Sequence, residues 1–184
     1  MLAICLSAAV AGAATIPHPS PEFAMNTADG KQILLSRYDG KTIVFAFILT
    51  TCPHCQNTIG ILGKLQSEYA SRGVQVLACA IEDAARRNLP GFIDRFKPPF
   101  PIGFSSRDPV IEYLQHPPML SLRMPALVFI DRHRTIRGQY EGDAPFFNDA
   151  EQEKNIRLEI DKLLKEANVS KAGQQKPRIA RAQK

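Results

Sequence analysis

Two apolar runs of strand length constrain the fold of this chain more than any other feature. Residues 42–49 have the sequence TIVFAFIL and residues 74–81 the sequence VQVLACAI. The first run is continuous, and the second is rich in β-branched and other apolar residues apart from Gln75. Such runs are typical of strands buried on both faces. Between the runs, apolar residues recur at helical spacing from Ile59 to Tyr69, and Gly73 supplies a helix stop. A strand, a helix and a second strand at this spacing predict a βαβ unit in a parallel sheet.

Further segments extend this unit on both sides. In chain order, we expect a strand at 32–36 bounded by two Asp-Gly turns, a helix at 86–96, a strand at 100–104, a helix at 110–114, an antiparallel strand pair at 126–130 and 135–140, and an amphipathic closing helix at 151–167. No internal repeat is visible.

The charge of the chain is concentrated at one end. The chain has 184 residues and a net charge of +5, and its last twenty residues carry six Lys or Arg and one Glu. A chain of this length is large enough to bury a core as a single domain. Because the basic end shows no apolar periodicity, we expect a disordered tail at 168–184 rather than a nucleic-acid-binding arm. The predicted globular domain therefore spans 17–167.

The N-terminal segment resembles an export signal. Residues 2–16 are uncharged and apolar, with small residues shortly before Pro17. This pattern matches the apolar core and cleavage region of a secretory signal and is short for a membrane span. No Lys or Arg precedes the run, so either the natural start lies further upstream or the signal is a weak one. An uncleaved segment with weak membrane association is the alternative. We expect 1–16 to be a signal peptide and the protein to be periplasmic or otherwise extracytoplasmic.

The Cys52-Pro53-His54-Cys55 motif lies between the first apolar run and the predicted helix. Cys52 falls at the helix N-cap, where free N–H groups and the helix dipole favour negative charge and hence the nucleophilic thiolate. Cys55 lies one turn later on the same face, within disulfide reach, and is expected to be the more buried, resolving thiol. Pro53 takes the first helical position, where its missing N–H costs nothing. The motif therefore predicts thiol–disulfide exchange.

His54 is the informative central residue of the motif. Its imidazole is placed to donate to the Cys52 thiolate, or to pair with it when protonated, which stabilises the reduced form and makes the disulfide more oxidising. A zinc site is the alternative for a cysteine pair, but His18, His116 and His133 are scattered and form no second pair at zinc-ligand spacing. We expect no metal and no cofactor.

A second candidate feature is Met124-Pro125, immediately before the predicted strand at 126–130. In combination with the cysteine motif, a proline here is expected to follow a cis peptide bond, with neighbouring backbone free to pair with an extended substrate. Pro125 therefore joins the cysteines as a candidate active-site residue. Pro53 and Met124 are candidates for substrate contact.

Together these residues resemble the extracytoplasmic thioredoxin-like redoxins of the TlpA/ResA type. The resemblance runs from about residue 21 to residue 164 and rests on Pro21-Glu22-Phe23, Asp29-Gly30-Lys31, Gly40-Lys41, the cysteine motif, Met124-Pro125 and Phe129-Ile130-Asp131. It implies an α/β, thioredoxin-like fold with a central mixed β-sheet flanked by helices and an N-terminal β-hairpin. It also implies a cis Pro125, substrate contact through the Met124 backbone, protein thiol or disulfide substrates, and a redox partner protein.

The chain departs from this family at several positions. It has no tryptophan, and Thr51 stands where most relatives carry one. Thioredoxin keeps a buried aspartate at the position of Ala46, so proton transfer from Cys55 needs another base here. Glu82 or Asp83, just past the second apolar run, is the candidate proton acceptor, because sites in open parallel sheets collect at this edge.

Other functions of the same fold stay open as alternatives. Peroxidases of this superfamily resemble a pattern with Pro and Thr where this chain has Phe45 and Leu49, which disfavours a peroxidase. A copper(I)-binding or copper-delivery module is an alternative because thiolates bind this soft ion, although its usual cysteine spacing is one residue longer. Cys79, inside the second apolar run, is expected to be an inert core thiol.

The direction of exchange is also open. The family resemblance favours reduction of substrates such as apocytochrome c. His54 favours the opposite direction, oxidation or reshuffling of exported proteins, because it stabilises the reduced motif. The reduction potential decides between the two.

Overall fold

The computed structural model describes the backbone of residues 15–174 and the side chains of residues 15–167. Nearly all of the predicted signal segment, Cys5 included, and the last ten residues of the chain lie outside this range. Within the described residues, no helix combines the length and apolar character needed to cross a membrane.

Eight strands form one mixed sheet. They are β1 (His18–Pro19), β2 (Ala24–Asn26), β3 (Gln32–Leu34), β4 (Thr42–Ile48), β5 (Val74–Ala80), β6 (Ile102–Phe104), β7 (Ala126–Ile130) and β8 (Thr135–Glu141). Their order is β1-β8-β7-β4-β5-β6-β2-β3. β4 is parallel to β5, with Thr42 opposite Val74, and antiparallel to β7, with Phe47 opposite Ala126. The predicted βαβ unit, mixed sheet and N-terminal hairpin (β2 and β3) are confirmed.

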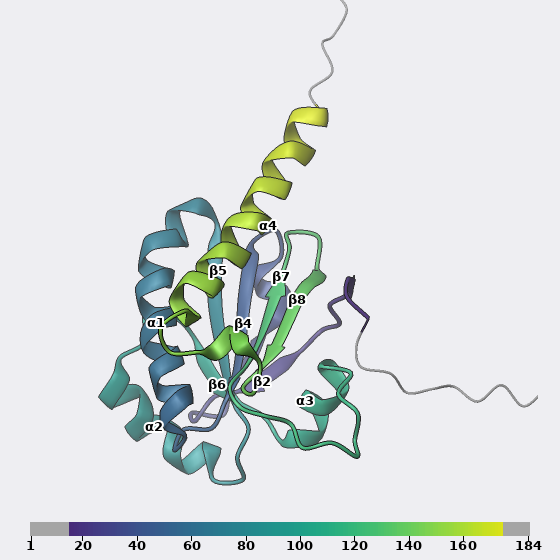
Figure 1. The fold of residues 1–184 in the computed structure, drawn as a ribbon. Coiled ribbons are helices and arrows are strands. Elements are labelled where there is room, and N and C mark those ends of the chain that lie inside the picture. Colours follow the sequence, from purple (N-terminus) through teal and green to yellow (C-terminus); the bar gives the residue numbers. More distant parts are fainter. Residues whose placement is uncertain (1–14, 175–184) are drawn as a thin grey trace, which may run out of the picture.

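Helices cover both faces of this sheet (Figure 1). They are α1 (Pro53–Tyr69), α2 (Ala85–Phe96), α3 (Arg107–Tyr113) and α4 (Gln152–Gln174), with short 3-10 turns η1 (Leu35–Tyr38), η2 (Ala70–Arg72) and η3 (Pro145–Phe147). Every residue of β4 is buried. Because successive strand side chains point to opposite faces, Val44 and Ile48 pack with α1, α2 and α4. Phe45 and Phe47 pack with α3 and the hairpin. The continuous apolar run of β4 thus contributes side chains to a hydrophobic core on each face of the sheet.

Four predicted boundaries are wrong by two residues or more. The strand predicted at 100–104 begins at Ile102, and the helix predicted at 110–114 begins at Arg107. The strand predicted at 32–36 ends at Leu34, because the amide of Ser36 donates to Glu22 Oε1 at 3.1 Å and the chain turns into η1. The closing helix predicted to end at residue 167 continues to Gln174, since no proline interrupts residues 168–174. The boundary predicted between domain and tail therefore falls inside a helix, and the remainder of the predicted tail lies outside the described residues.

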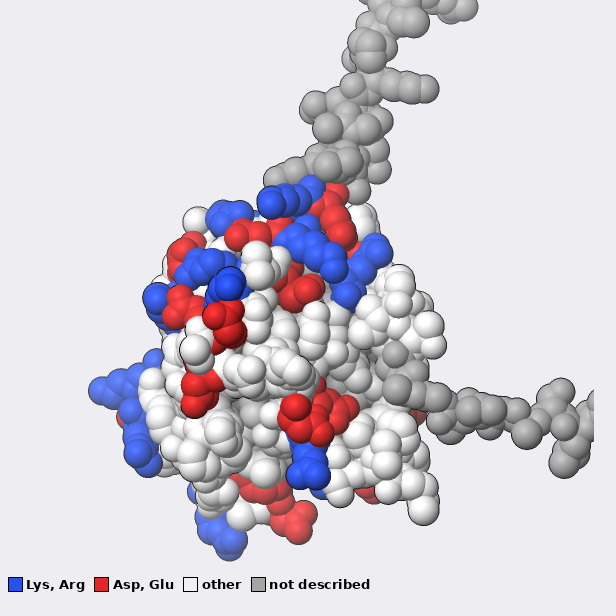
Figure 2. All heavy atoms as spheres, in the orientation of Figure 1, with Lys and Arg blue, Asp and Glu red and all other residues white. Residues whose placement is uncertain are grey.

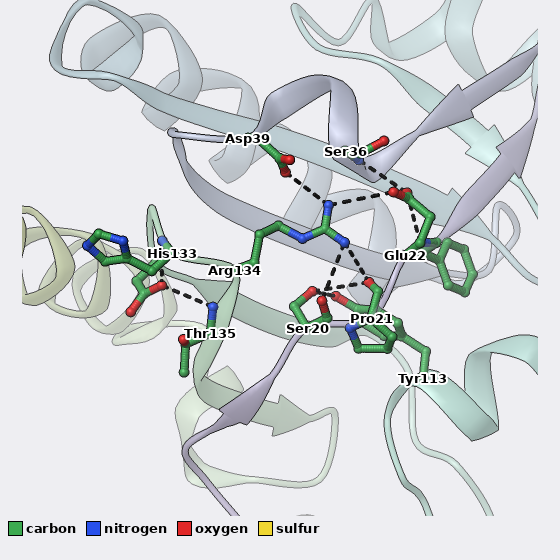
Figure 3. Close-up of polar contacts among 11 residues, drawn as sticks. Ser20, Pro21, Glu22, Ser36, Asp39, Tyr113, His133, Arg134 and Thr135 are labelled. Atoms are coloured by element: carbon green, nitrogen blue, oxygen red, sulfur yellow. Dashed lines mark hydrogen bonds and ion pairs between the residues drawn. The ribbon is translucent and has the colours of Figure 1, made fainter.

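Arg134, in the turn between β7 and β8, binds the segment at Ser20–Glu22 that leads into β2 (Figure 3). Its guanidinium donates to Asp39 Oδ1 at 3.0 Å and to the carbonyl oxygens of Ser20 and Pro21 at 3.3 and 2.9 Å. Glu22 Oε2 lies 3.7 Å from the same group. These contacts hold the segment that leads into β2 against the end of the sheet that lies away from the cysteine motif.

Charged side chains on the face containing α1 and α4 are interleaved (Figure 2). Ion pairs join Lys64 to Glu153 at 2.8 Å and Arg72 to Asp161 at 3.0 Å, so they link α1 and η2 to α4. Exposed pairs of this kind contribute about 1 kcal/mol or less each. The fixed position of α4 therefore rests mainly on its buried residues, among them Ile156 and Ile160.

Candidate active site

Cys52 lies where the central strand gives way to the motif helix. It is the N-cap residue of α1, with φ −82° and ψ 122°, and Pro53 is the first helical residue. The carbonyl oxygen of Cys52 accepts a hydrogen bond from the amide of Gln56 at 3.0 Å, which closes the first turn. Cys52 is half-buried. The predicted position of this thiol, at the positive end of a helix, is confirmed.

Cys55 lies one turn further along α1 and is fully buried. Its sulfur accepts a hydrogen bond from the amide of Leu49 at 3.4 Å. Burial raises the pKa of the Cys55 thiol well above its ordinary value; the Leu49 amide opposes this, and the neighbouring Cys52 sulfur and Glu82 carboxylate add to it. Cys55 therefore needs a base before it can react, whereas Cys52 is the more accessible of the two thiols.

The two candidate bases occupy different environments. Glu82 Oε1 accepts hydrogen bonds from the Thr50 amide at 3.1 Å and from the Thr50 hydroxyl, and Asn88 Nδ2 lies 3.5 Å away. Glu82 Oε2 is buried and has no hydrogen-bond partner among the described residues. Asp83 is exposed. The fold thus brings Glu82, and not Asp83, to the buried side of the motif.

His54 lies on the exposed side of α1. It lines an open hollow of about 620 Å³ together with Asn57, Asp149 and Glu153. No hydrogen bond joins its ring to Cys52 within the described part of the chain, because the second helical position faces outward here. The contact predicted between this imidazole and the Cys52 sulfur is absent from this conformation.

Met124-Pro125 is joined by a cis peptide bond. Because Ala126 is paired with Phe47 near the end of β4, this segment lies at the same edge of the sheet as the cysteine motif. Gly142 packs directly against it: its amide donates to the Arg123 carbonyl oxygen at 3.2 Å. A Cβ atom at Gly142 would lie 2.4 Å from the Met124 carbonyl oxygen. Sequence reasoning missed Gly142, since only the approach of two distant segments shows why it must be small.

A hollow of about 320 Å³ adjoins the motif on the side of α2. It is lined by Thr50, Thr51, Gln56, Asn88, Gly91, Phe92, Arg95 and Phe96. Gln56 Nε2 donates to the Thr50 carbonyl oxygen at 2.9 Å. Thr50, Gln56 and Asn88 carry no sequence pattern that marks them as site residues, and the structure alone brings them to the motif.

Cys79 lies on the other side of the sheet from Cys55. It is fully buried in the core formed by Phe45, Phe47 and α3, and burial raises the pKa of its thiol. Cys52, Cys55 and Cys79 are the free thiols of the described residues. Over the same range, no three His, Cys, Asp or Glu side chains are grouped so that they could hold a metal ion.

Comparison with known proteins identifies the family of this chain. The Redoxin family model matches residues 17–154. The chain belongs to the Redoxin family. Among curated relatives of this redoxin are the thiol-disulfide oxidoreductases ResA of Geobacillus thermodenitrificans (27% identical over 99 residues, 54% of this chain and 56% of the relative) and of Geobacillus kaustophilus (25% over 125 residues, 68% of each). The match thus spans roughly half to two thirds of the length of these relatives.

Solved structures show the same fold. A thiol:disulfide interchange protein of the thioredoxin family from Chlorobium tepidum aligns with a TM-score of 0.66 at 21% identity, covering 83% of this redoxin and 99% of that chain. The thioredoxin domain of a thiol-disulfide oxidoreductase from Bacteroides vulgatus aligns with a TM-score of 0.57 at 17% identity, covering 73% and 94%. The thioredoxin-like fold expected from the sequence is confirmed.

Proposed function

We propose that this redoxin is a thiol–disulfide oxidoreductase that acts on protein thiols and disulfides through Cys52 and Cys55. The observation that carries the proposal is the asymmetry of the pair: a half-buried thiol at the N-terminus of α1 and a fully buried thiol one turn behind it. An accessible nucleophile followed by a protected resolving thiol is what a reversible exchange requires. The named activity of the ResA relatives supports the same conclusion.

In the reductive direction, the Cys52 thiolate attacks one sulfur of a substrate disulfide. A mixed disulfide forms between Cys52 and the substrate, and the other substrate sulfur leaves as a thiolate. Cys55 then loses its proton and attacks the Cys52 sulfur, which forms the Cys52–Cys55 disulfide and releases the second substrate thiol. The substrate gains two electrons and the motif loses two, which a redox partner protein returns. Oxidation of substrates is the same sequence reversed.

The remaining candidate residues take supporting roles in this cycle. Glu82 accepts the proton of Cys55, since it is the carboxylate on the buried side of the motif. The backbone beside the cis Met124-Pro125 bond pairs with the extended substrate segment. Pro53, the exposed first residue of α1, contacts the same substrate. His54, on the exposed side of α1, raises the reduction potential through its charge when protonated.

The proposal includes a cell compartment outside the cytoplasm and exported proteins as substrates. We expect the domain to work outside the cytoplasm after export directed by 1–16, where reduction of exported proteins keeps their cysteines available. The Redoxin match begins at residue 17, directly after that segment. The resemblance to the TlpA/ResA type makes reduction the expected direction.

The test is turnover of a protein disulfide by cysteine variants. Cys52→Ala should abolish reduction of insulin, and Cys55→Ala should accumulate mixed disulfides that survive in non-reducing gels. Cys79→Ala is the matched control and should keep its turnover, because Cys79 lies in the opposite core. Full turnover by Cys52→Ala would overturn the proposal. Stoichiometric bound copper without exchange activity would point instead to a copper-delivery module.

A further inference from the structure

Two consecutive backbone amides hold the two groups that must exchange a proton in the proposed cycle. The Leu49 amide donates to Cys55 Sγ at 3.4 Å. The next amide, that of Thr50, donates to Glu82 Oε1 at 3.1 Å. The loop between β4 and α1 therefore holds both the resolving sulfur and the carboxylate, and the Glu82 carboxylate is close enough to Cys55 to interact with it electrostatically.

The donors around Glu82 are distributed unevenly between its two oxygens. Oε1 receives the Thr50 amide and the Thr50 hydroxyl, with Asn88 Nδ2 at 3.5 Å. Asn88 also donates to Thr50 Oγ1 at 3.3 Å, so the hydroxyl hydrogen is directed to the carboxylate. Oε2 is buried without any donor from the described part of the chain. A buried acceptor left without a partner is unfavourable, so Oε2 is the oxygen of this carboxylate that is free to receive a proton.

We propose that Thr50 and Asn88 are positioning residues that hold Glu82 by one oxygen and reserve the other, Oε2, for the proton of Cys55. This inference rests on the proposed thiol–disulfide exchange and deepens it. When Cys55 resolves a mixed disulfide, its S–H proton moves to Oε2 and its sulfur bonds to Cys52 Sγ. The bond between Cys52 and the substrate breaks, and the substrate leaves as a thiolate. In the reverse reaction Oε2 returns the proton to Cys55.

The charged and titratable groups around this site come from several elements. Cys52, the N-cap residue of α1, and Glu82, after β5, interact with Cys55. Cys79 on β5 interacts with Glu82 from the opposite core, and Arg95 on α2 lines the hollow shared with Thr50. Burial raises the pKa of Cys55, so the resolving step requires that its thiol lose a proton. If Thr50 and Asn88 assist that proton loss, removing either side chain should change how the rate of the resolving step depends on pH.

Rapid mixing with the aromatic disulfide reagent 5,5′-dithiobis(2-nitrobenzoate) separates the two thiols. The first equivalent of thionitrobenzoate reports attack by Cys52, and the second reports attack by Cys55 on the resulting mixed disulfide. Thr50→Val keeps the side-chain shape and removes the hydroxyl. It should leave the first phase unchanged and slow the second about tenfold at neutral pH, part of the 10²–10⁴-fold that a positioned base supplies. The slowed phase should recover as the pH rises and Cys55 ionises without help.

Matched variants separate positioning from structure. Thr50→Ser restores the hydroxyl and should restore the second phase. Thr42→Val removes a buried hydroxyl that has no hydrogen-bond partner among the described residues, at the far end of β4, and should change neither phase. In a Glu82→Gln background, Thr50→Val should have no further effect, because the two act through one group. Asn88→Leu should slow the second phase in the same manner and carries the test if Thr50→Val does not fold.

The outcomes are distinguishable. A second phase with the wild-type rate and pH profile in Thr50→Val overturns the positioning role, as does equal slowing of both phases. Additive effects of Thr50→Val and Glu82→Gln also overturn it. If the unmodified protein itself shows no second phase, the proposed function fails in its assignment of Cys55, whatever Thr50 does.

Discussion

The substitution Gly142→Ala should displace the Met124–Pro125 backbone by roughly 1 Å. The added Cβ would lie 2.4 Å from the Met124 carbonyl oxygen and 2.7 Å from its carbonyl carbon. Carbon and oxygen atoms of this kind approach no closer than about 3.3 Å, so the backbone must move by roughly 1 Å. A shift of about 1 Å in a substrate-positioning segment lowers turnover on the order of 10²-fold. The strain should also lower the free energy of unfolding by about 1–3 kcal/mol.

The assay compares a protein substrate with a small reagent. Gly142→Ala should lose about 10²-fold in kcat/KM for insulin reduction, because an extended substrate pairs with the displaced backbone. The reaction of Cys52 with an aromatic disulfide reagent should be unchanged, since that reagent makes no backbone pairing. Gly60→Ala is the matched control: Gly60 lies in α1, and a Cβ atom there would have no neighbour within 4 Å among the described residues outside its own stretch of helix. It should keep full turnover and gain about 0.5–1 kcal/mol of stability. Wild-type insulin turnover by Gly142→Ala would refute the reasoning.

Two further predictions concern charge. His54→Ala should lower the reduction potential by up to about 30 mV, the equivalent of about 1.4 kcal/mol, and an unchanged potential in glutathione buffers would mean that the imidazole does not act on the motif. Burial alone would raise the pKa of Asp131, but hydrogen bonds from Arg137 and from the Thr135 and His133 amides outweigh it and hold the pKa below its ordinary value. A lowered pKa stabilises the fold above the unfolded-state pKa, so Asp131→Asn should lose about 2 kcal/mol at neutral pH. In urea unfolding the difference from wild type should shrink as the pH falls below about 4, and a constant difference would contradict this account.

The parts of the fold that follow from local pattern were predictable from the sequence. The apolar run of β4 and the spacing of Ile59, Leu62 and Leu65 on α1 fix the strand, the helix and therefore the N-cap position of Cys52. Periodicity carries this information because the burial of one helix face or of both strand faces repeats along the chain.

The parts that depend on contacts between distant segments were not predictable. Glu82 and Asp83 are neighbours in sequence, and only the path of the loop after β5 brings one of them to Thr50 and Asn88. Gly142 and Met124 meet because β7 and β8 pair with Ala126 opposite Glu141, in a register that shifts near Phe129 and Ile130. The sequence predicts the strand pair but not this register. The predicted end of α4 at residue 167 is too early, because a polar, basic segment is compatible with either helix or tail.

The most direct test of the central claim is the redox equilibrium of the protein in glutathione buffers, with free thiols alkylated and located by mass spectrometry. The account predicts that Cys52 and Cys55 lose their thiols together in one two-electron transition, with a tenfold change in the equilibrium for every ~30 mV, while Cys79 stays reduced throughout. Continued alkylation of Cys52 and Cys55 under oxidising conditions, or a disulfide between either of them and another cysteine, would contradict it.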